Sequence, residues 1–181
     1  MSSNHFGSIA PFDEKPNRIS YPKLLVLDVD GVLTDGTKIY TPTGVLGKRF
    51  FERDFTAMKE FKRQGVQVVC MTSDPMNVAL LAVKSRHIRV HVAYRDSKID
   101  TLTTIAEEHG VGLDDWSEVA YVGDDLEDFT VLRSVKADGG WAFTPANHHP
   151  KLDQFNTLPV DGGEGVVEYL YWTFFKEDLR Q

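Results

Sequence analysis

Acidic residues follow two apolar segments that lie far apart in the chain. Residues 24–27 are apolar and lead into Asp28 and Asp30, while Asp124 and Asp125 follow a second apolar segment. Carboxylates about 4 Å apart repel by roughly 4 kcal/mol at an effective dielectric constant of about 20, so a cluster of them requires a cation or shared protons. An all-oxygen set without His or Cys favours Mg²⁺.

Two hydroxyls and a lysine add to these candidate residues. Thr72 and Ser73 follow the apolar segment 66–71, and Lys98 begins a predicted helix. A carboxylate nucleophile, a divalent cation, a lysine and a hydroxyl are the components of phosphoryl transfer through an aspartyl-phosphate. Taken singly, each has a plainer interpretation, because strand-end acids and hydroxyls cap turns and helices, and most lysines lie on the surface.

Strands and helices alternate along the sequence, which predicts the elements that position these side chains. The alternation implies parallel strands with right-handed crossovers, and therefore a three-layer doubly wound (Rossmann-like) α/β sheet. A β-hairpin is expected after the first strand, with no inserted cap domain. The carboxyl ends of the strands then share one edge, where ligands bind. The predicted strands are 24–27, 66–71, 90–93, 118–122 and 140–143, with a hairpin of 38–41 and 45–50.

Helices are predicted between these strands from the spacing of apolar residues. Residues 96–97 are candidates to cap the third of them. The predicted helices are 55–64, 75–86, 98–109, 126–135, a short one within 147–155, and 165–179.

Composition and charge limit the classes of function. The chain has 181 residues, 41% hydrophobic and 26% charged, and we expect a tail at 1–22 without a signal-peptide core and one domain at 23–181. The net charge of -7 argues against a nucleic-acid or anionic-membrane partner, and no apolar segment approaches a membrane span. The single cysteine, Cys70, is expected to be buried, which fits a reducing cytoplasm.

Four motifs in order resemble those of the haloacid dehalogenase superfamily. They are Asp28-Val-Asp-Gly-Val-Leu-Thr-Asp35, Thr72, Lys98 and Gly123-Asp-Asp-Leu-Glu-Asp128. The long first motif, the hairpin directly after it and the lack of a cap resemble one branch of that superfamily. This branch contains 3-deoxy-D-manno-octulosonate 8-phosphate phosphatase and its nonulosonate 9-phosphate relatives. The resemblance extends over roughly 23–169.

The resemblance implies a magnesium-dependent phosphatase acting on a small phosphorylated sugar. Asp28 would attack phosphorus, and Asp30 would protonate the leaving alcohol and then deprotonate water. Asp28, Asp124 and the backbone carbonyl of Asp30 would hold Mg²⁺. Thr72, Ser73 and Lys98 would bind the phosphoryl oxygens.

Two further acids have open interpretations. Asp125 is expected to support the site from behind its ligands, and either Asp124 or Asp125 could cap the helix that follows. Asp128 either supports the site too or is an ordinary acid in the first helical turn.

The sequence departs from the branch where the branch contacts its sugar acid. Thr72-Ser73-Asp74 replaces the common Thr-Gly-Arg, Asp54-Phe55 replaces Asp-Gly, and Gly162-Gly-Glu-Gly-Val-Val-Glu-Tyr169 lacks the arginine often found there. This pattern fits a phosphatase with a changed leaving group. The basic residues that could compensate are Lys48, Arg49, Arg53, Arg86 and Arg95.

The branch forms tetramers through its hairpins, so the resemblance also implies a homotetramer. Exposed apolar residues on a hairpin agree with that expectation; they are Ile39, Tyr40, Val45, Leu46 and Phe50. The alternative function is a non-catalytic assembly or regulatory domain that kept the fold, as in domains fused to sugar-nucleotide synthetases. The presence of both Asp28 and Asp30 favours the enzyme.

Overall fold

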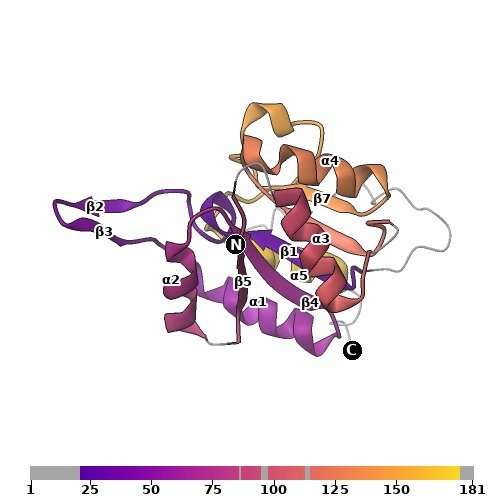
Figure 1. Ribbon diagram of the computed structural model, residues 1–181, viewed down its shortest axis with the longest axis horizontal. Helices are drawn as coiled ribbons and strands as arrows, with labels where there is room; N and C mark the ends of the chain where they lie inside the picture. The colour runs from indigo at the N-terminus through magenta and orange to yellow at the C-terminus, as the bar shows by residue number, and fades with distance from the viewer. Residues whose placement is uncertain (1–20, 86, 95–97, 113–114, 176–181) are drawn as a thin grey trace, which may run out of the picture.

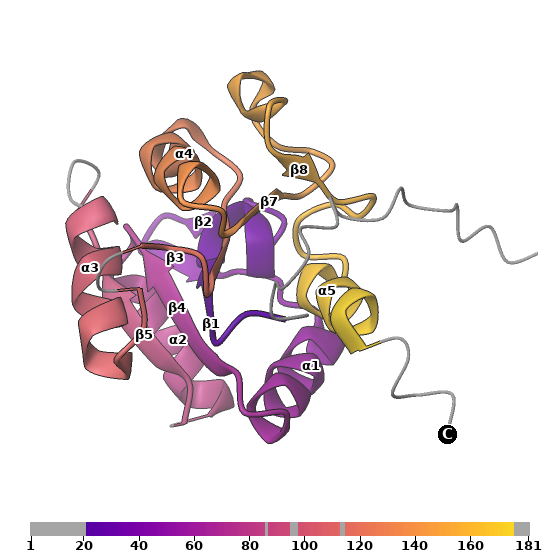
Figure 2. The same cartoon turned by 90° about the vertical axis from the view of Figure 1, so that its right-hand side faces the viewer.

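A six-stranded parallel sheet forms the centre of the molecule. The structure is a computed structural model, and it describes residues 21–85, 87–94, 98–112 and 115–175. The strands lie in the order β5-β4-β1-β6-β7-β8, with helices on both faces (Figures 1 and 2). Their bounds are β1 Leu24–Asp28, β4 Gln67–Thr72, β5 Arg89–Val92, β6 Val119–Val122, β7 Trp141–Thr144 and β8 Asn156–Thr157.

Two hydrophobic cores lie on opposite faces of this sheet. Helices α1 (Glu52–Arg63), α2 (Met76–Lys84) and α5 (Val166–Phe175) cover one face, and α3 (Lys98–His109) and α4 (Phe129–Ala137) cover the other. Alternate residues of β1 enter alternate cores, because side chains of a strand point to opposite faces. Every residue of β1 is buried, as expected for a central parallel strand.

The predicted doubly wound fold is confirmed, with corrections near the end of the chain. Strand β8 was not predicted, since its two residues are polar and carry no apolar pattern. The helix expected within 147–155 is only a 3₁₀ turn at Pro150–Leu152. The helix expected at 126–135 begins as a 3₁₀ turn, Leu126–Asp128, before α4. The proposed cap at 96–97 and the last predicted helical residues, 176–179, lie outside the described residues.

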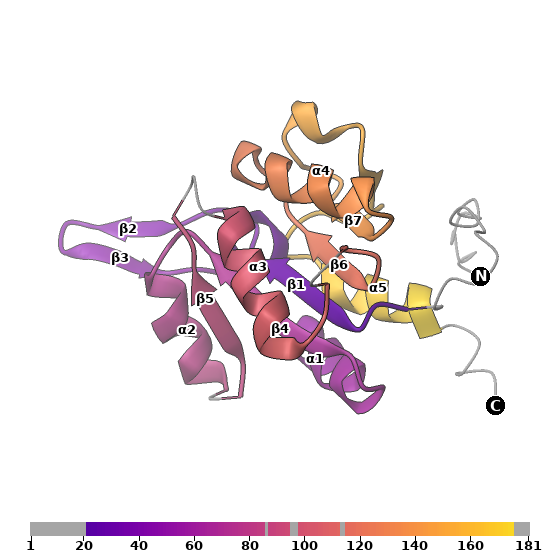
Figure 3. The ribbon, with the colours of Figure 1, turned by 45° about the vertical axis from the view of Figure 1, so that its right-hand side comes forward.

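The predicted hairpin is present but shorter than expected. It pairs β2 (Ile39–Thr41) with β3 (Gly44–Gly47) and extends away from the sheet (Figure 3). Phe50 is not part of it, because Phe50 forms a bridge to Thr34 and packs on the core. The strongly exposed apolar residues of the hairpin are therefore Ile39, Tyr40 and Leu46, at 56%, 71% and 71% exposure. No helix among the described residues has the length and apolar character to cross a membrane.

A buried carboxylate joins α1 to the start of α5. Oδ1 of Asp54 accepts hydrogen bonds from the backbone N–H groups of Val167 and Glu168, at 2.9 and 3.0 Å. This caps the N-terminus of α5, whose free N–H groups favour negative charge. Oδ2 of Asp54 has no hydrogen-bond partner among the described residues. Burial raises the pKa of Asp54 to about 6, although both backbone hydrogen bonds oppose the shift.

This raised pKa predicts a pH dependence of stability. The folded state binds the Asp54 proton more tightly than the unfolded state, so the free energy of unfolding falls as the pH rises from about 4 to about 6. Relative to Asp54→Asn, the wild type should lose on the order of 3 kcal/mol over this range, because one pKa unit corresponds to ~1.4 kcal/mol. Urea unfolding of both proteins across the range measures the difference. The exposed Asp138→Asn is the control, and a difference that stays constant with pH would contradict the prediction.

Candidate active site

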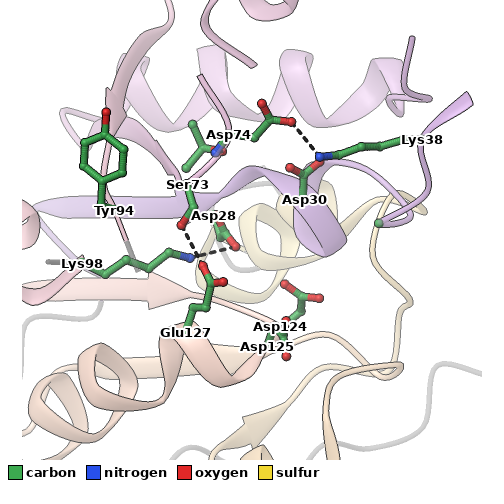
Figure 4. A pocket seen from close by; sticks show the side chains of 12 residues that line it. Asp28, Asp30, Lys38, Ser73, Asp74, Tyr94, Lys98, Asp124, Asp125 and Glu127 are labelled. Atoms are coloured by element: carbon green, nitrogen blue, oxygen red, sulfur yellow. Dashed lines mark hydrogen bonds and ion pairs between the residues drawn. The ribbon is translucent and has the colours of Figure 1, made fainter. Parts of the chain in front are cut away.

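A cavity of about 560 Å³ lies at the carboxyl edge of the sheet. The ends of β1, β4 and β6 supply most of its wall, and Figure 4 shows the side chains that point into it. After β1 the chain makes a tight turn, Val29–Leu33, in which Gly31 has a φ of 79°. A side chain is excluded there, since a Cβ on Gly31 would lie 1.9 Å from Oδ2 of Asp124. The lining residues are Asp28, Asp30, Gly36, Lys38, Thr72, Ser73, Asp74, Tyr94, Lys98, Asp124, Asp125 and Glu127.

Three carboxylates meet at this cavity: Asp28 and Asp124 line it, and Asp128 lies buried beside them in the 3₁₀ turn after β6. Asp28, Asp124 and Asp128 each place one oxygen within 4.8 Å of the others, which confirms the predicted convergence of the first and fourth strand ends. Burial, together with the charges of Asp128 and Asp125, raises the pKa of Asp124 to about 7. Burial and Asp128 likewise raise the pKa of Asp28, against the opposing effect of Lys98. The donor set and this unbalanced charge fit a divalent cation bound by oxygen.

Lys98 is the buried cation of this cluster. Its Nζ lies 3.2 Å from Oδ2 of Asp28 and 2.7 Å from Oδ1 of Asp128, and only 3% of its side chain is exposed. Burial alone would lower the pKa of Lys98, but the two carboxylates raise it above the usual lysine value. Lys98 is therefore charged at neutral pH and holds one face of Asp28.

Asp128 lies at the site. The sequence left open whether it supports the site or is an ordinary acid in the first helical turn. It is fully buried, and its Oδ1 accepts hydrogen bonds from Lys98 at 2.7 Å and from the hydroxyl of Tyr121 at 2.5 Å. Its Oδ2 accepts from the backbone N–H groups of Asp124 and Asp125. Because both its oxygens accept hydrogen bonds, Asp128 orients Lys98, Tyr121 and the backbone that follows β6. Sequence reasoning missed Tyr121, because a tyrosine inside an apolar strand is read as core.

Asp30 lies in a second network, separate from the three carboxylates. Nζ of Lys48 contacts both its oxygens, at 2.7 and 2.8 Å, and Nδ2 of Asn77 donates to Oδ2 at 3.0 Å. Nδ2 of Asn77 also donates to Oγ1 of Thr72 at 2.7 Å, which joins this network to the end of β4. Asn77 was missed because nothing in the sequence distinguishes it from an exposed helix residue.

Asp74 is the second anion of this network. Lys48, whose side chain has no exposed surface, reaches Oδ2 of Asp74 at 2.8 Å, and Lys38 from the start of the hairpin reaches the same atom at 2.9 Å. Burial alone would raise the pKa of Asp74, but hydrogen bonds from Lys48 and Lys38 hold it well below the usual range. Asp74, at the position where the resemblance implies an arginine, is thus an ionised carboxylate between two lysines.

Two other proposed basic residues that the structure describes, Arg49 and Arg53, do not line the cavity. Arg49 pairs with Asp35 and Glu164, and Arg53 pairs with Glu168. Arg86 and Arg95 lie outside the described residues. Of the compensating residues expected from sequence, only Lys48 is therefore observed in the site's networks. Lys38 was missed, because it was read only as part of the hairpin.

Two polar contacts close the side of the cavity formed by the loop after β6. Ser73 donates a hydrogen bond to Oε2 of Glu127 at 2.8 Å. The carboxylate of Asp125 accepts from the backbone N–H of Leu126 at 2.6 Å and caps the 3₁₀ turn, so Asp125 and not Asp124 is the cap. Both acids belong to the wall, and neither joins the cluster around Asp28.

A glycine pair near the end of the chain packs against the loop after β1. The backbone N–H of Gly163 donates to the carbonyl of Val32 at 2.9 Å. A Cβ on Gly162 would lie 1.9 Å from the carbonyl oxygen of Gly31, so only glycine allows this approach. This segment precedes α5, whose N-terminus is capped by Asp54. The loop that carries Asp30 is therefore held from outside by the C-terminal part of the chain.

Comparisons with known proteins identify relatives with this architecture. No family model matches the chain. The chain is similar to the 3-deoxy-D-manno-octulosonate 8-phosphate phosphatase KdsC of Escherichia coli strain K12, with 29% identity over 157 residues, covering 80% of this chain and 74% of that protein. The Haemophilus influenzae protein of the same name is 25% identical over 144 residues, covering 80% of this chain and 77% of the relative.

Solved structures similar to this one include phosphatases for the same octulosonate 8-phosphate. The 3-deoxy-D-manno-octulosonate 8-phosphate phosphatase of Moraxella catarrhalis, solved with magnesium, phosphate and KDO, superposes with a TM-score of 0.73 at 25% identity over 86% of each chain. The cobalt-bound Haemophilus influenzae phosphatase has a TM-score of 0.73 at 23% identity, covering 87% of this chain and 89% of that one, and supports the fold. The chain is thus similar to phosphatases of the haloacid dehalogenase superfamily, and these relatives support a phosphatase. Within it, the chain resembles the 3-deoxy-D-manno-octulosonate 8-phosphate phosphatases.

The close approach of Gly162 predicts a strong effect of a single methyl group. Gly162→Ala should lower kcat for a phosphate ester at least tenfold, because the new Cβ must displace the backbone at Gly31 and with it the loop that carries Asp30. Steady-state assays with p-nitrophenyl phosphate measure this loss. Gly47→Ala is the matched control, because a Cβ at Gly47 meets no atom within 4 Å. Equal kcat values for the two variants would contradict the prediction.

Proposed function

We propose that the chain is a magnesium-dependent phosphomonoester hydrolase that acts on a small sugar phosphate through an aspartyl-phosphate on Asp28. One observation carries this proposal. Asp28 faces the cavity at the end of a buried strand, with Lys98 at 3.2 Å and Asp124 in the same oxygen cluster. A nucleophile beside a buried cation and a metal-binding acid is the arrangement that this chemistry requires.

The carboxylates of Asp28 and Asp124, with the backbone carbonyl of Asp30, would hold Mg²⁺. Asp128 is a poorer ligand despite its proximity, because Lys98, Tyr121 and two backbone N–H groups already occupy its oxygens. When bound, the cation neutralises charge on the phosphoryl oxygens and permits the approach of an anionic nucleophile.

In the first step, an oxygen of Asp28 forms a bond to phosphorus. The bond from phosphorus to the sugar oxygen breaks, and the leaving oxygen takes a proton from Asp30. Lys48 and Asn77 fix the direction of the Asp30 carboxyl group, because together they contact both its oxygens. Lys98 opposes the burial and the Asp128 charge that raise the pKa of Asp28, and so favours the carboxylate that this step needs.

In the second step, water attacks the aspartyl-phosphate. Asp30 accepts a proton from this water, the new oxygen bonds to phosphorus, and the bond to Asp28 breaks. The products are inorganic phosphate and regenerated Asp28. Asp30 ends this step protonated and ready for the next leaving group, so the same side chain serves both steps.

Thr72 and Lys98 bind the phosphoryl oxygens in this proposal, whereas Ser73 would have to give up its hydrogen bond to Glu127 to do so. Oγ1 of Thr72 already accepts hydrogen bonds from Asn77 at 2.7 Å and from the backbone N–H of Asp74 at 3.1 Å. Its own proton can therefore be donated to a phosphoryl oxygen. Lys98 supplies the charge that stabilises the transferring group.

The relatives indicate the type of ester. They are named for octulosonate 8-phosphate, and we propose a sugar phosphate of the octulosonate 8-phosphate or nonulosonate 9-phosphate type, with the phosphate on a terminal carbon. A homotetramer built on the hairpin and a cytoplasmic location complete the proposal. The second candidate, a non-catalytic assembly or regulatory domain, is supported by the exposed Ile39, Tyr40 and Leu46, and it predicts no turnover.

Replacement of the nucleophile separates these functions. Asp28→Asn should fold normally but hydrolyse p-nitrophenyl phosphate at least a thousandfold more slowly, because an amide cannot form the aspartyl-phosphate. EDTA should silence the wild type, and excess Mg²⁺ should restore it. Asp35→Asn is the matched control, since Asp35 belongs to the same loop but not to the cavity lining. Undiminished turnover by Asp28→Asn would refute the covalent mechanism, and an inactive wild type would favour the second candidate.

A further inference from the structure

Asp74 lies at the centre of a network that no step of the proposed reaction uses directly. Its Oδ2 contacts Nζ of Lys48 at 2.8 Å and Nζ of Lys38 at 2.9 Å, and its Oδ1 accepts a hydrogen bond from the backbone N–H of Met76 at 2.9 Å. Its own backbone N–H donates to Oγ1 of Thr72 at 3.1 Å. Asp74 is therefore fixed between the end of β4 and the first residue of α2, and it presents one carboxylate oxygen to two lysines.

Lys48 depends on an anchor of this kind. It follows β3 and belongs to no strand or helix, yet its side chain has no exposed surface. Its Nζ contacts both oxygens of Asp30, Oδ2 of Asp74 and Oδ1 of Asn77, at 2.7 or 2.8 Å in each case. A buried ammonium group needs acceptors for its three N–H donors, and the loss of a charged partner is costly. Asp74 thus ties Lys48 to the edge of the sheet.

The contacts from Asp74 through Lys48 end at the carboxyl group of Asp30. Figure 4 shows Asp30, Asp74 and Lys38 on one side of the cavity, apart from Lys98. Asp74 stays ionised there, because hydrogen bonds from Lys48 and Lys38 outweigh its burial and hold its pKa well below the usual range. The negative charge that holds Lys48 in place is therefore present at neutral pH.

We infer that Asp74 is a positioning residue, which holds Lys48 and through it orients the carboxyl group of Asp30 toward the leaving oxygen. This inference rests on the proposed phosphatase function and concerns the same site. At this position the resemblance implies an arginine that contacts the sugar acid, whereas Asp74 contacts the chain's own lysines. Recognition of the sugar is then a task of other residues, and the departure at Asp74 is compatible with an octulosonate or nonulosonate ester.

Three phosphate esters that each carry one benzene ring test this inference. p-Nitrophenyl phosphate releases a comparatively acidic phenol, phenyl phosphate a phenol about as weakly acidic as a tyrosine side chain, and benzyl phosphate an alcohol. Proton donation by a general acid matters more as the leaving oxygen becomes more basic. With Mg²⁺, Asp74→Asn should therefore lower kcat/KM at least tenfold for benzyl phosphate, less for phenyl phosphate, and less than threefold for p-nitrophenyl phosphate. Equal losses for all three esters would overturn the inference.

Asparagine is the replacement that separates positioning from a structural role. Its Oδ1 can still accept from Met76, and the backbone hydrogen bond to Thr72 is kept, so α2 and the phosphate-binding hydroxyl retain their contacts. Its amide nitrogen cannot accept from a lysine. The inhibition constant of inorganic phosphate should therefore stay within twofold of the wild-type value, and a larger change would overturn the inference. Asp138→Asn removes the same charge from an exposed position outside the cavity lining, and it should leave every kcat/KM unchanged.

A double variant tests whether Asp74 acts through Lys48. Lys48→Met keeps a long apolar side chain but removes the ammonium group, and it should lower kcat/KM for benzyl phosphate at least as much as Asp74→Asn. The combined variant should lose no more than Lys48→Met alone, because residues that act as one unit are not additive. Losses that multiply in the combined variant would show independent roles and overturn the inference.

The inference and the proposed function fail in different ways. A wild type that hydrolyses none of the three esters refutes the function, and the inference falls with it. A wild type that hydrolyses p-nitrophenyl phosphate alone has no working general acid for Asp74 to position, which overturns the inference only. The same holds if the wild type hydrolyses all three esters and Asp74→Asn slows them equally.

Discussion

The buried contact of Lys98 with Asp28 and Asp128 is the interaction on which the site depends. Charges are costly to remove from water, and the buried charge of Lys98 is tolerable because two carboxylates contact it. The hydroxyl of Tyr121 donates in turn to Asp128. Lys98 is one positive charge among three carboxylates, Asp28, Asp124 and Asp128, and the remaining negative charge favours a bound cation beside them. These ion pairs connect the end of β1, the N-terminus of α3 and the 3₁₀ turn that precedes α4.

A second buried lysine organises the other half of the cavity. Lys48 joins Asp30 to Asp74, and through Asn77 the same network reaches Thr72. The cavity therefore has two buried cations, each held between acids, with the Asp28 carboxylate on one side and the Asp30 carboxylate on the other. This division keeps the proposed nucleophile and the proposed acid in different surroundings although they are two residues apart.

Much of this arrangement could be predicted from the sequence, for physical reasons that differ among residues. The alternation of apolar strands and helices fixes which ends share an edge, so the meeting of Asp28 with Asp124 follows from topology alone. The partners of Asp30 could not be found in that way. Lys48 reaches it only through the path of the hairpin, and Asn77 lies on a helix whose rotation is set by packing. The two-residue strand β8 left no pattern to detect.

The contact between Gly162–Gly163 and the loop after β1 also bears on how the protein is made. A ribosome releases the residues of that loop early and the glycine pair near the end of synthesis, so the loop lacks its outer support while most of the chain emerges. Contacts between such distant parts of a sequence also form late in folding, because closing a long loop costs entropy. The cavity is thus completed late in translation, and a chain interrupted before Gly162 would lack both the support of the loop that carries Asp30 and the helix α5 that covers one face of the sheet.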